Sequence, residues 1–342
     1  MRLALFTHSA EENGLGRAFA LWLVAKELGW EIRIVTPATD KPWWPLAQEK
    51  SFLGDFETDA RAAAAWCDLL LALKPWPGSL DLALELGRAQ HKPVALDVDD
   101  PDWEDVFGES RRRQVATFVQ RSLRGHPPLH EYRLHFAASR LGTVLISNPA
   151  LERWYPNATV IPHARSARAA GAPHRRSEEI EIAFVGSVRP HKGVEILRQA
   201  VERAGGMRLT ITGTEPPDAR PNEHWSGETS LEEGLRILDR ADVVAIPSQD
   251  WTYSRGQLPV KIIDAMMAGR AVVGSDLEPI RWALGGSGIV VPPADVEALA
   301  AALDSLRSPD IRADLGARAR ERALATFTPS AIAPALAAAL AL

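Results

Sequence analysis

The chain has 342 residues, of which 46% are hydrophobic and 24% are charged, and its net charge is −5. This length exceeds one ordinary hydrophobic core and suits two domains of roughly 150 to 180 residues each, and the composition argues against global disorder. The negative net charge argues against a general nucleic-acid-binding protein, because such a protein needs a basic surface to displace counterions.

The single cysteine, Cys67, cannot form an internal disulfide, which is typical of a reducing compartment. Residues 1–6 are too short an apolar run for a signal peptide, and no stretch reaches the ~18 apolar residues of a membrane-spanning helix. We therefore expect a cytoplasmic protein, either free or peripheral at the inner membrane face.

In the first half of the chain, short β-branched or leucine-rich runs alternate with longer amphipathic stretches. The predicted strands are residues 2–6, 31–35, 68–73, 93–98 and 143–146, with helices such as 16–28 and 79–90 between them. This alternation is typical of parallel strands joined by crossover helices. It predicts a Rossmann-like, doubly wound domain over residues 1–165.

A stretch without sustained apolar periodicity, residues 166–179, then reads as a surface linker. The second half begins afresh and predicts a domain over residues 180–325. Its predicted strands are 180–185, 207–212, 242–246, 271–273 and 288–291, with helices at 194–204, 231–240 and 260–268. A last helix within 326–342 either packs locally or crosses back to the first domain. The predicted fold class is thus α/β, with two doubly wound parallel-sheet domains facing a cleft.

The first loop of the second domain carries the clearest chemical signal, since ligands bind at the carboxyl ends of parallel strands. Residues 184–193 read FVGSVRPHKG, a strand followed by a glycine turn and then the cations Arg189 and Lys192. Glycine exposes backbone amides, and cationic side chains supply the counter-charges that a diphosphate needs. The alternative is a solvated basic turn.

A second loop, residues 254–269, reads SRGQLPVKIIDAMMAG. Pro259 suits the first turn of a helix, on which Lys261 and Asp264 share one face. There the carboxylate can accept both ribose hydroxyls, while the lysine and the free amides of residues 257–260 approach the phosphates. The alternative is an ordinary surface ion pair between Lys261 and Asp264.

Together these segments, with TG at 212–213, IPS at 246–248 and RAVVGSD at 270–276, resemble the donor half of a family 4 (GT4) retaining glycosyltransferase of the GT-B fold. In the first half, NGLGR at 13–17, VALDVDDPDW at 94–103 and VIPH at 160–163 agree with that family in order and spacing. The resemblance implies that Lys192 holds the donor phosphates and Asp264 the ribose.

Two positions depart from the family pattern. Ser187 stands where an arginine usually follows the glycine, and Gly256 replaces the first glutamate of the Glu-x7-Glu motif. We expect Arg189 to supply the missing cation, and Gln257 or backbone amides to contact the donor sugar.

In the first half, NGLGR superficially suggests a dinucleotide fingerprint, but Phe19 stands where its third glycine belongs. The loop is either a tight glycine turn with a helix cap or a loop that faces the cleft near the donor phosphates or the acceptor. Asp97, Asp99, Asp100 and Asp102 then form the densest carboxylate cluster. Its open interpretations are a divalent metal site, helix capping, and positioning of the acceptor or the donor sugar.

The predicted site combines these features. Its donor-binding residues are Gly14, Gly16, Gly186, Ser187, Gln257, Leu258, Pro259, Val260, Lys261 and Asp264. Arg189, Lys192 and Asp100 are expected to be catalytic, and Asp99 and Arg17 to position the acceptor or the sugar.

The resemblance implies a hexosyltransferase that moves a sugar from a UDP- or GDP-sugar to a small-molecule, glycan or lipid-linked acceptor, with retention and without a metal or other cofactor. The alternatives are an epimerase or hydrolase of sugar nucleotides, and an inactive nucleotide-sugar-binding subunit. The arginine-rich stretch 111–140 is either a solvated helical surface or a contact with an anionic membrane.

Overall fold

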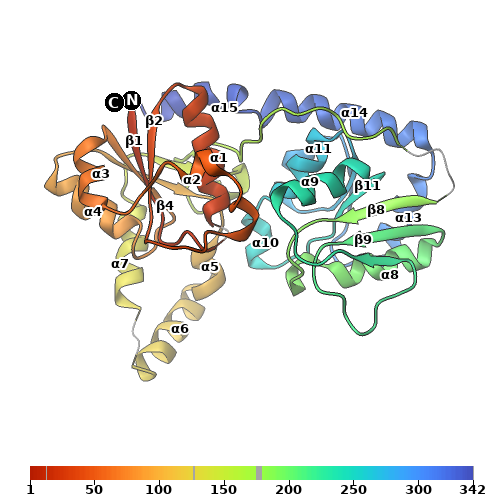
Figure 1. The fold of residues 1–342 in the computed structure, drawn as a ribbon. Helices are drawn as coiled ribbons and strands as arrows, with labels where there is room; N and C mark the ends of the chain where they lie inside the picture. The colour runs from red at the N-terminus through yellow and green to blue at the C-terminus, as the bar shows by residue number, and fades with distance from the viewer. Residues whose placement is uncertain (13, 126–127, 175–178, 342) are drawn as a thin grey trace. The chain divides into compact units, whose positions relative to one another are not determined.

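The computed structural model describes residues 1–12, 14–125, 128–174 and 179–341. The chain divides into two compact units, one formed by Met1–Ala164 and Pro329–Leu342 and the other by Arg165–Thr328 (Figure 1). Asn13, which opens the NGLGR segment, lies outside the described residues.

The first unit is built on a seven-stranded parallel sheet. In spatial order its strands are β3 (Phe56–Glu57), β2 (Glu31–Val35), β1 (Arg2–Phe6), β4 (Leu69–Leu73), β5 (Val94–Val98), β6 (Val144–Ile146) and β7 (Thr159–Val160). Every residue of the central strand β4 is buried. Helices cover both faces of such a sheet, which is why β4 reads as a continuous apolar run.

Helices connect these strands and close the unit. They are α1 (Gly14–Glu27), α2 (Lys50–Leu53), α3 (Ala60–Trp66), α4 (Leu80–Ala89), α5 (Asp102–Phe107), α6 (Arg111–Leu123), α7 (Leu129–Ala138) and α15 (Pro329–Ala339), with 3-10 turns at Trp44–Leu46 and Pro149–Arg153. α15 packs beside α1 although the two lie at opposite ends of the sequence (Figure 1). It buries Ile332 and Leu336 there, so the last helix belongs to the first unit.

The second unit contains a six-stranded parallel sheet. Its strands, in spatial order, are β10 (Glu223–Trp225), β9 (Met207–Ile211), β8 (Ile180–Phe184), β11 (Val243–Ile246), β12 (Ala271–Ser275) and β13 (Ile289–Val291). Its helices are α8 (Val194–Ala204), α9 (Leu231–Arg240), α10 (Thr252–Gly256), α11 (Val260–Met267), α12 (Glu278–Leu284), α13 (Val296–Ser305) and α14 (Pro309–Thr326), with a 3-10 turn, η3, at Pro190–Lys192.

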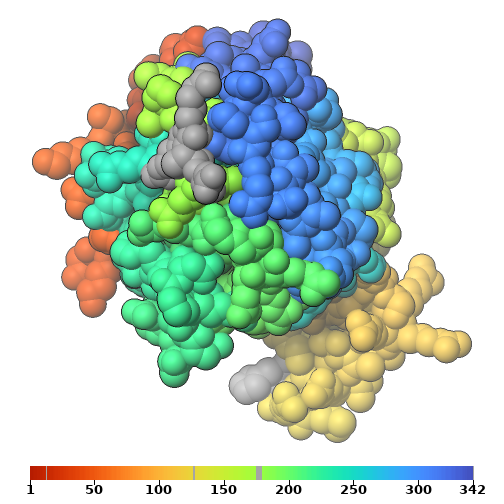
Figure 2. Space-filling view, turned by 90° about the vertical axis from the view of Figure 1, so that its right-hand side faces the viewer, coloured from red at the N-terminus to blue at the C-terminus, as the bar shows by residue number. Residues whose placement is uncertain are grey.

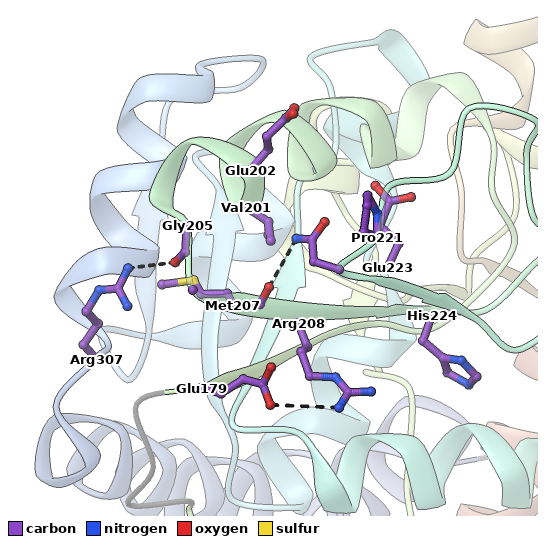
Figure 3. A pocket seen from close by; sticks show the side chains of 12 residues that line it. Glu179, Val201, Glu202, Gly205, Met207, Arg208, Pro221, Glu223, His224 and Arg307 are labelled. Carbon is purple, nitrogen blue, oxygen red and sulfur yellow. Dashed lines mark hydrogen bonds and ion pairs between the residues drawn. The ribbon is translucent and has the colours of Figure 1, made fainter.

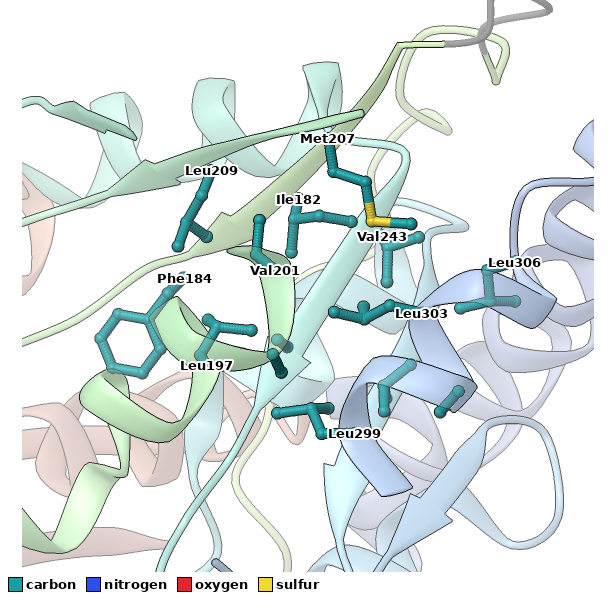
Figure 4. Close-up of a cluster of buried hydrophobic side chains, with 14 of the residues drawn as sticks. Ile182, Phe184, Leu197, Val201, Met207, Leu209, Val243, Leu299, Leu303 and Leu306 are labelled. Carbon is teal, nitrogen blue, oxygen red and sulfur yellow. The ribbon is translucent and has the colours of Figure 1, made fainter. Parts of the chain in front are cut away.

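The alternation of side chains along each strand divides the core of the second unit into two layers. In β8, Ile182 and Phe184 face α8 and α13, whereas Ala183 faces the layer around α11. Figure 4 shows the first layer, in which Leu197 and Leu303 close over the sheet. Because side chains of a strand alternate with period two, the sheet presents one apolar face to each helical layer.

Both sheets reverse their strand order beside the first strand of the unit. β1 pairs with β2 on one side and β4 on the other, and β8 pairs with β9 and β11. Open parallel sheets bind ligands at the carboxyl ends of strands at such a switch point. The loops after β1 and β4, and after β8 and β11, are therefore the places to examine.

The predicted α/β class with two doubly wound parallel sheets is confirmed, and the ten predicted strands lie within two residues of observed ones. The short strands β3, β7 and β10 were missed, because two or three residues carry no readable period. Part of the predicted linker is bound to the second unit: the backbone N–H groups of Gly171 and Ala172 donate to the carbonyls of Ala268 and Asp239 at 3.0 and 2.9 Å. Residues 175–178 lie outside the described residues.

Candidate functional site

The glycine turn after β8 is fixed by the end of the neighbouring strand. Gly186 has φ +130°, a conformation that side chains rarely adopt. Its N–H donates to Thr212 Oγ1 at 2.7 Å, and the Thr212 hydroxyl donates back to the Gly186 carbonyl at 2.9 Å. The turn thereby exposes Gly186 and Ser187 at the carboxyl edge of the sheet.

Gly193 ends the same loop where α8 begins, and no other residue fits there. It is left-handed with φ +68°, and a Cβ at this position would lie 1.9 Å from the carbonyl oxygen of Pro247. The backbone following β8 therefore touches the backbone following β11. This contact brings the first predicted loop close to the loop that leads to α10 and α11.

Lys261, in the first turn of α11, reaches back to the glycine turn. Its Nζ lies 3.5 Å from the centroid of the Phe184 ring and 3.1 Å from the point that a Cβ on Gly186 would occupy. Although the side chain as a whole is partly exposed, its Nζ is buried and has no hydrogen-bond partner among the described residues. Burial, and next the Lys192 ammonium, lower the pKa of Lys261 well below its usual value. A buried amine with no anionic partner is suited to receive an anion.

Lys192 and Gln257 join the two predicted loops directly, because the Lys192 ammonium donates to Gln257 Oε1. Arg189 precedes η3 and is exposed. Two lysines thus flank the glycine turn, with an exposed arginine on the same loop. The structure brings together Gly186, Lys192, Gln257 and Lys261 as the sequence predicted.

The prediction that residues 257–260 offer free amides needs correction. The Gln257 N–H donates to the Tyr253 carbonyl at 3.0 Å, because the short helix α10 ends there, and Pro259 has no N–H. Of the four residues, Leu258 and Val260 are the two whose backbone N–H groups remain to be considered. In the described structure neither donates its N–H to another residue.

Asp264 lies on α11 and is held by Arg165, the last residue of the predicted first domain. Arg165 Nε donates to Asp264 Oδ1 at 2.8 Å, and the two side chains are 15% and 11% exposed. The described residues show no ion pair between Asp264 and Lys261, so the alternative of a surface pair on the helix is wrong. A carboxylate accepts hydrogen bonds from hydroxyls, and Arg165 fixes the orientation of this one.

In the first unit, Lys74 gathers the aspartates that follow β5. Its Nζ lies 3.3 Å from Asp99 Oδ1, 3.2 Å from Asp100 Oδ2 and 2.6 Å from Asp102 Oδ2. Lys74 is buried and left-handed, with φ 64°, which is rare for a residue with a side chain. Such backbone strain is concentrated at functional sites.

Three carboxylates share one ammonium in this cluster, and burial raises the pKa of Asp99 to about 7, an effect that Lys74 opposes and Asp100 increases. Burial likewise raises the pKa of Asp102, and that of Glu104 to about 7. The cluster can therefore exchange a proton near neutral pH, as a general acid or base requires.

Arg17 was predicted to position the acceptor or the sugar, but it is too deeply buried to contact either one directly. Arg17 is 1% exposed and donates from Nε and Nη2 to both oxygens of Asp97, at 2.9 and 2.6 Å, and from Nη2 to the Ile161 carbonyl. A buried bidentate pair joins α1 to β5 and has no surface to offer a substrate. Gly14 begins α1, and Gly16 lies under the Trp43 indole; their donor role stays a prediction.

A hollow of about 820 Å³ lies in the second unit at the amino ends of β9 and β10 (Figure 3). Its charged groups are engaged: Arg307 donates to the Ala204 and Gly205 carbonyls at 2.8 and 2.9 Å, and Glu223 binds Arg198 at 2.8 Å. The predicted residues lie at the carboxyl ends of the strands instead, so this hollow is not the site. Within the described ranges, no three His, Cys, Asp or Glu side chains form a group that could hold a metal ion.

Sequence reasoning missed two residues of these clusters. Lys74 follows a buried strand directly and precedes a proline, a position at which a cation at the sheet edge could have been noticed. Arg165 lies at the predicted boundary between the first domain and the linker, and nothing local indicates its partner. Among the described helices, none combines the length and the apolar composition that crossing a bilayer requires.

Comparison with known proteins agrees with this geometry. Residues 179–308 match the family described as "Glycosyl transferases group 1". The D-inositol 3-phosphate glycosyltransferase of Mycobacterium ulcerans is 27% identical over 161 residues, and that of Corynebacterium glutamicum 29% over 150 residues. The chain matches about a third of the length of these relatives, 33% and 35%, and 42% and 36% of its own residues are covered.

Solved structures match nearly the whole chain. The sucrose-phosphate synthase of Thermosynechococcus elongatus superposes with a TM-score of 0.71 at 17% identity, covering 99% of this chain and 98% of that one. Anabaena HepE, solved in complex with UDP and glucose, superposes with a TM-score of 0.69 at 14% identity and 99% coverage of both chains. Residues 179–308 are therefore similar to the group 1 glycosyltransferases, and the two parallel α/β units have the GT-B fold.

Proposed function

We propose that this protein transfers a sugar from a UDP- or GDP-sugar to a hydroxyl-bearing acceptor, with retention of anomeric configuration. The observation that carries the proposal is the buried, unpaired Nζ of Lys261 beside the Gly186 turn, with Lys192 joined to the same helix start through Gln257. This arrangement suits a diphosphate. The relatives support the donor class, since Anabaena HepE was solved with UDP-glucose and Staphylococcus aureus TarM with UDP.

Catalysis in this proposal is electrostatic. When the glycosidic bond breaks, the diphosphate leaves with additional negative charge, which Lys192, Lys261 and the exposed Arg189 stabilise where it develops. The Lys261 amine takes up a proton when the anion arrives, because the anion restores the pKa that burial has lowered. Since side chains supply these charges, we expect turnover to persist when divalent cations are chelated with EDTA.

On the side of the first unit, we propose that Asp99 and Asp100 position the acceptor or the sugar. Lys74 holds both carboxyls 3.2 to 3.3 Å from its Nζ at the carboxyl end of β5. The raised pKa of Asp99, about 7, places a proton on the cluster at neutral pH. A carboxyl in that state can donate to or accept from an acceptor hydroxyl.

The test of the donor assignment is Asp264→Ala, measured by titration with UDP, GDP and their 2′-deoxy forms. Loss of hydrogen bonds to a charged acceptor predicts binding weaker by about 1.5 to 3 kcal/mol, or one to two decades. Wild type should prefer the ribonucleotide, and the variant should bind both forms alike. Discrimination that survives in the variant removes Asp264 from the ribose site.

The chain supplies a matched control in Asp239, which pairs with Arg168 of the same segment that Arg165 belongs to. Asp239→Ala removes that ion pair and leaves the Arg165–Asp264 contact in place, so it should leave nucleotide affinity within about threefold of wild type. Incubation with sugar nucleotides, with and without an acceptor pool, then distinguishes the activities. Release of nucleotide that requires acceptor indicates transfer, release without it a hydrolase, and binding without release an inactive subunit.

A further inference from the structure

Two helices of the first unit, α6 and α7, form a hairpin that extends away from the sheet (Figure 1). We call these two helices, Arg111–Leu123 and Leu129–Ala138, the α6–α7 arm. No described residue of α6 is buried. In the space-filling view the arm, in tan and yellow, presents much of its surface to solvent (Figure 2).

The inner side of the arm explains why the two helices stay together. Phe118 of α6 meets the Tyr132 ring of α7 edge to face at 5.4 Å, and the Tyr132 hydroxyl donates to the Gln114 carbonyl at 2.8 Å. Arg121 pairs with Glu131 at 2.9 Å. These contacts use one side of α6 and leave its opposite side without a partner.

That opposite side carries an apolar stripe. Val115, Val119 and Leu123 are spaced by four residues, so they lie on one face of the helix. They are 62%, 49% and 84% exposed. Single exposed hydrophobic residues are common on protein surfaces, but three in line on a projecting helix form a continuous strip.

Exposed arginines lie at both ends of α6, with Arg111 and Arg112 in its first turn near the stripe and Arg124 directly after its last residue. Arg111, Arg112 and Arg124 are exposed, and none of them forms an ion pair in the described structure. Residues 111–140 contain seven arginines and one glutamate, a net charge of +6, whereas the whole chain carries −5. This segment is thus net positive in a chain that is net negative.

We propose that the α6–α7 arm docks on an anionic lipid surface. The arginines fit the phosphates of anionic headgroups, and the stripe fits the boundary between headgroups and acyl chains, as in interfacial amphipathic helices. A soluble polyanion would engage the arginines but leave the stripe in water. A second copy of the chain would bring two strongly positive arms together, which their charge opposes.

Docking would also serve the acceptor side of the site. α5 (Asp102–Phe107) joins the aspartates held by Lys74 to the arm within the same unit. An acceptor carried by a lipid would therefore be presented next to Asp99 and Asp100. This last step rests on the proposed function, whereas docking itself does not.

Docking is measured by co-sedimentation of the full chain with vesicles of neutral phosphatidylcholine alone or mixed with anionic phosphatidylglycerol. We expect binding to the anionic vesicles that weakens as salt rises from about 0.05 M to about 0.5 M, since screening shortens the reach of surface charge. Each arginine near such a surface strengthens binding about fivefold, so Arg111→Gln with Arg112→Gln and Arg124→Gln should weaken it by about 100-fold.

A second variant changes the stripe without changing the charge: Val115→Gln, Val119→Gln and Leu123→Gln should weaken vesicle binding by about tenfold or more. The matched control, Arg61→Gln with Arg88→Gln, removes two exposed arginines elsewhere in the same unit and should change binding by less than about threefold. Circular dichroism and nucleotide affinity should be unchanged in every variant, which separates this test from that of the proposed function. Equal binding to neutral and anionic vesicles, binding to heparin without vesicle binding, or no vesicle binding would each overturn the proposal.

Discussion

Replacing Lys261 with methionine should stabilise the protein and impair its binding of nucleotide at the same time. The lysine Nζ is buried over the Phe184 ring without a hydrogen-bond partner, and burial lowers its pKa well below the usual value. An unsatisfied buried donor costs about 1 to 3 kcal/mol, which methionine removes while keeping a favourable sulfur–aromatic contact. For a unit of this size the melting temperature should rise by roughly 2 to 12 °C.

The lowered pKa of Lys261 determines whether the stability of wild type rises or falls with pH. Between the lowered pKa of Lys261 in the folded protein and its value of about 10.4 in the unfolded chain, the unfolded chain binds a proton that the folded protein does not. The stability of wild type therefore rises with pH across that window. Lys261→Met lacks this contribution, so its advantage in melting temperature should shrink as pH increases toward about 10.

The assays are scanning calorimetry from neutral to alkaline pH and titration with UDP or GDP. Affinity should fall by one to two decades, because a charge-assisted contact to the diphosphate is lost. Lys50→Met, at an exposed helix position, is the matched control and should change neither quantity. A lower melting temperature for Lys261→Met, or nucleotide affinity within about threefold of wild type, would refute this account of Lys261.

Three further outcomes follow from the geometry. Gly193→Ala should lower the free energy of unfolding, measured in urea, by about 3 kcal/mol or more, because the added Cβ would overlap the Pro247 carbonyl. The control Gly227→Ala also has a positive φ but open space around the added Cβ, so it should lower that free energy by only about 1 kcal/mol. Burial raises the pKa of Asp99 to about 7, so between about pH 4 and pH 7 the folded protein holds a proton that the unfolded chain releases. The stability of the folded protein therefore falls as pH rises through this window, and Asp99→Asn should reduce the fall in melting temperature from pH 5 to pH 8. Lys74→Met should lower kcat while changing the KM for the donor less. Because the aspartates lose their positive partner, the apparent pKa of the acidic limb of the profile of kcat against pH should rise. An unchanged profile assigns Lys74 to folding alone.

Local chemistry accounts for what the sequence determined. Strands buried on both faces appear in the sequence as apolar runs. Because these runs alternate with amphipathic helical stretches, they indicate parallel sheets joined by crossover helices, so the fold class followed from the sequence. The glycine turn at Gly186 and the start of α11 after Pro259 are likewise set by backbone preferences of single residues. Such features depend on neighbours a few residues away, which a sequence displays directly.

Pairings across the sheets were decided only by the tertiary structure. Arg17 lies in a loop-and-helix segment that suggested a substrate contact, yet strand order places it against Asp97, 80 residues away, where burial makes it structural. Asp264 meets Arg165 across 99 residues, and Lys74 reaches Asp100 across 26. The partner of a charged side chain depends on which strands become neighbours, and burial then sets its pKa. Neither quantity is written in the local sequence, so the residue types of the site could be predicted while their partners could not.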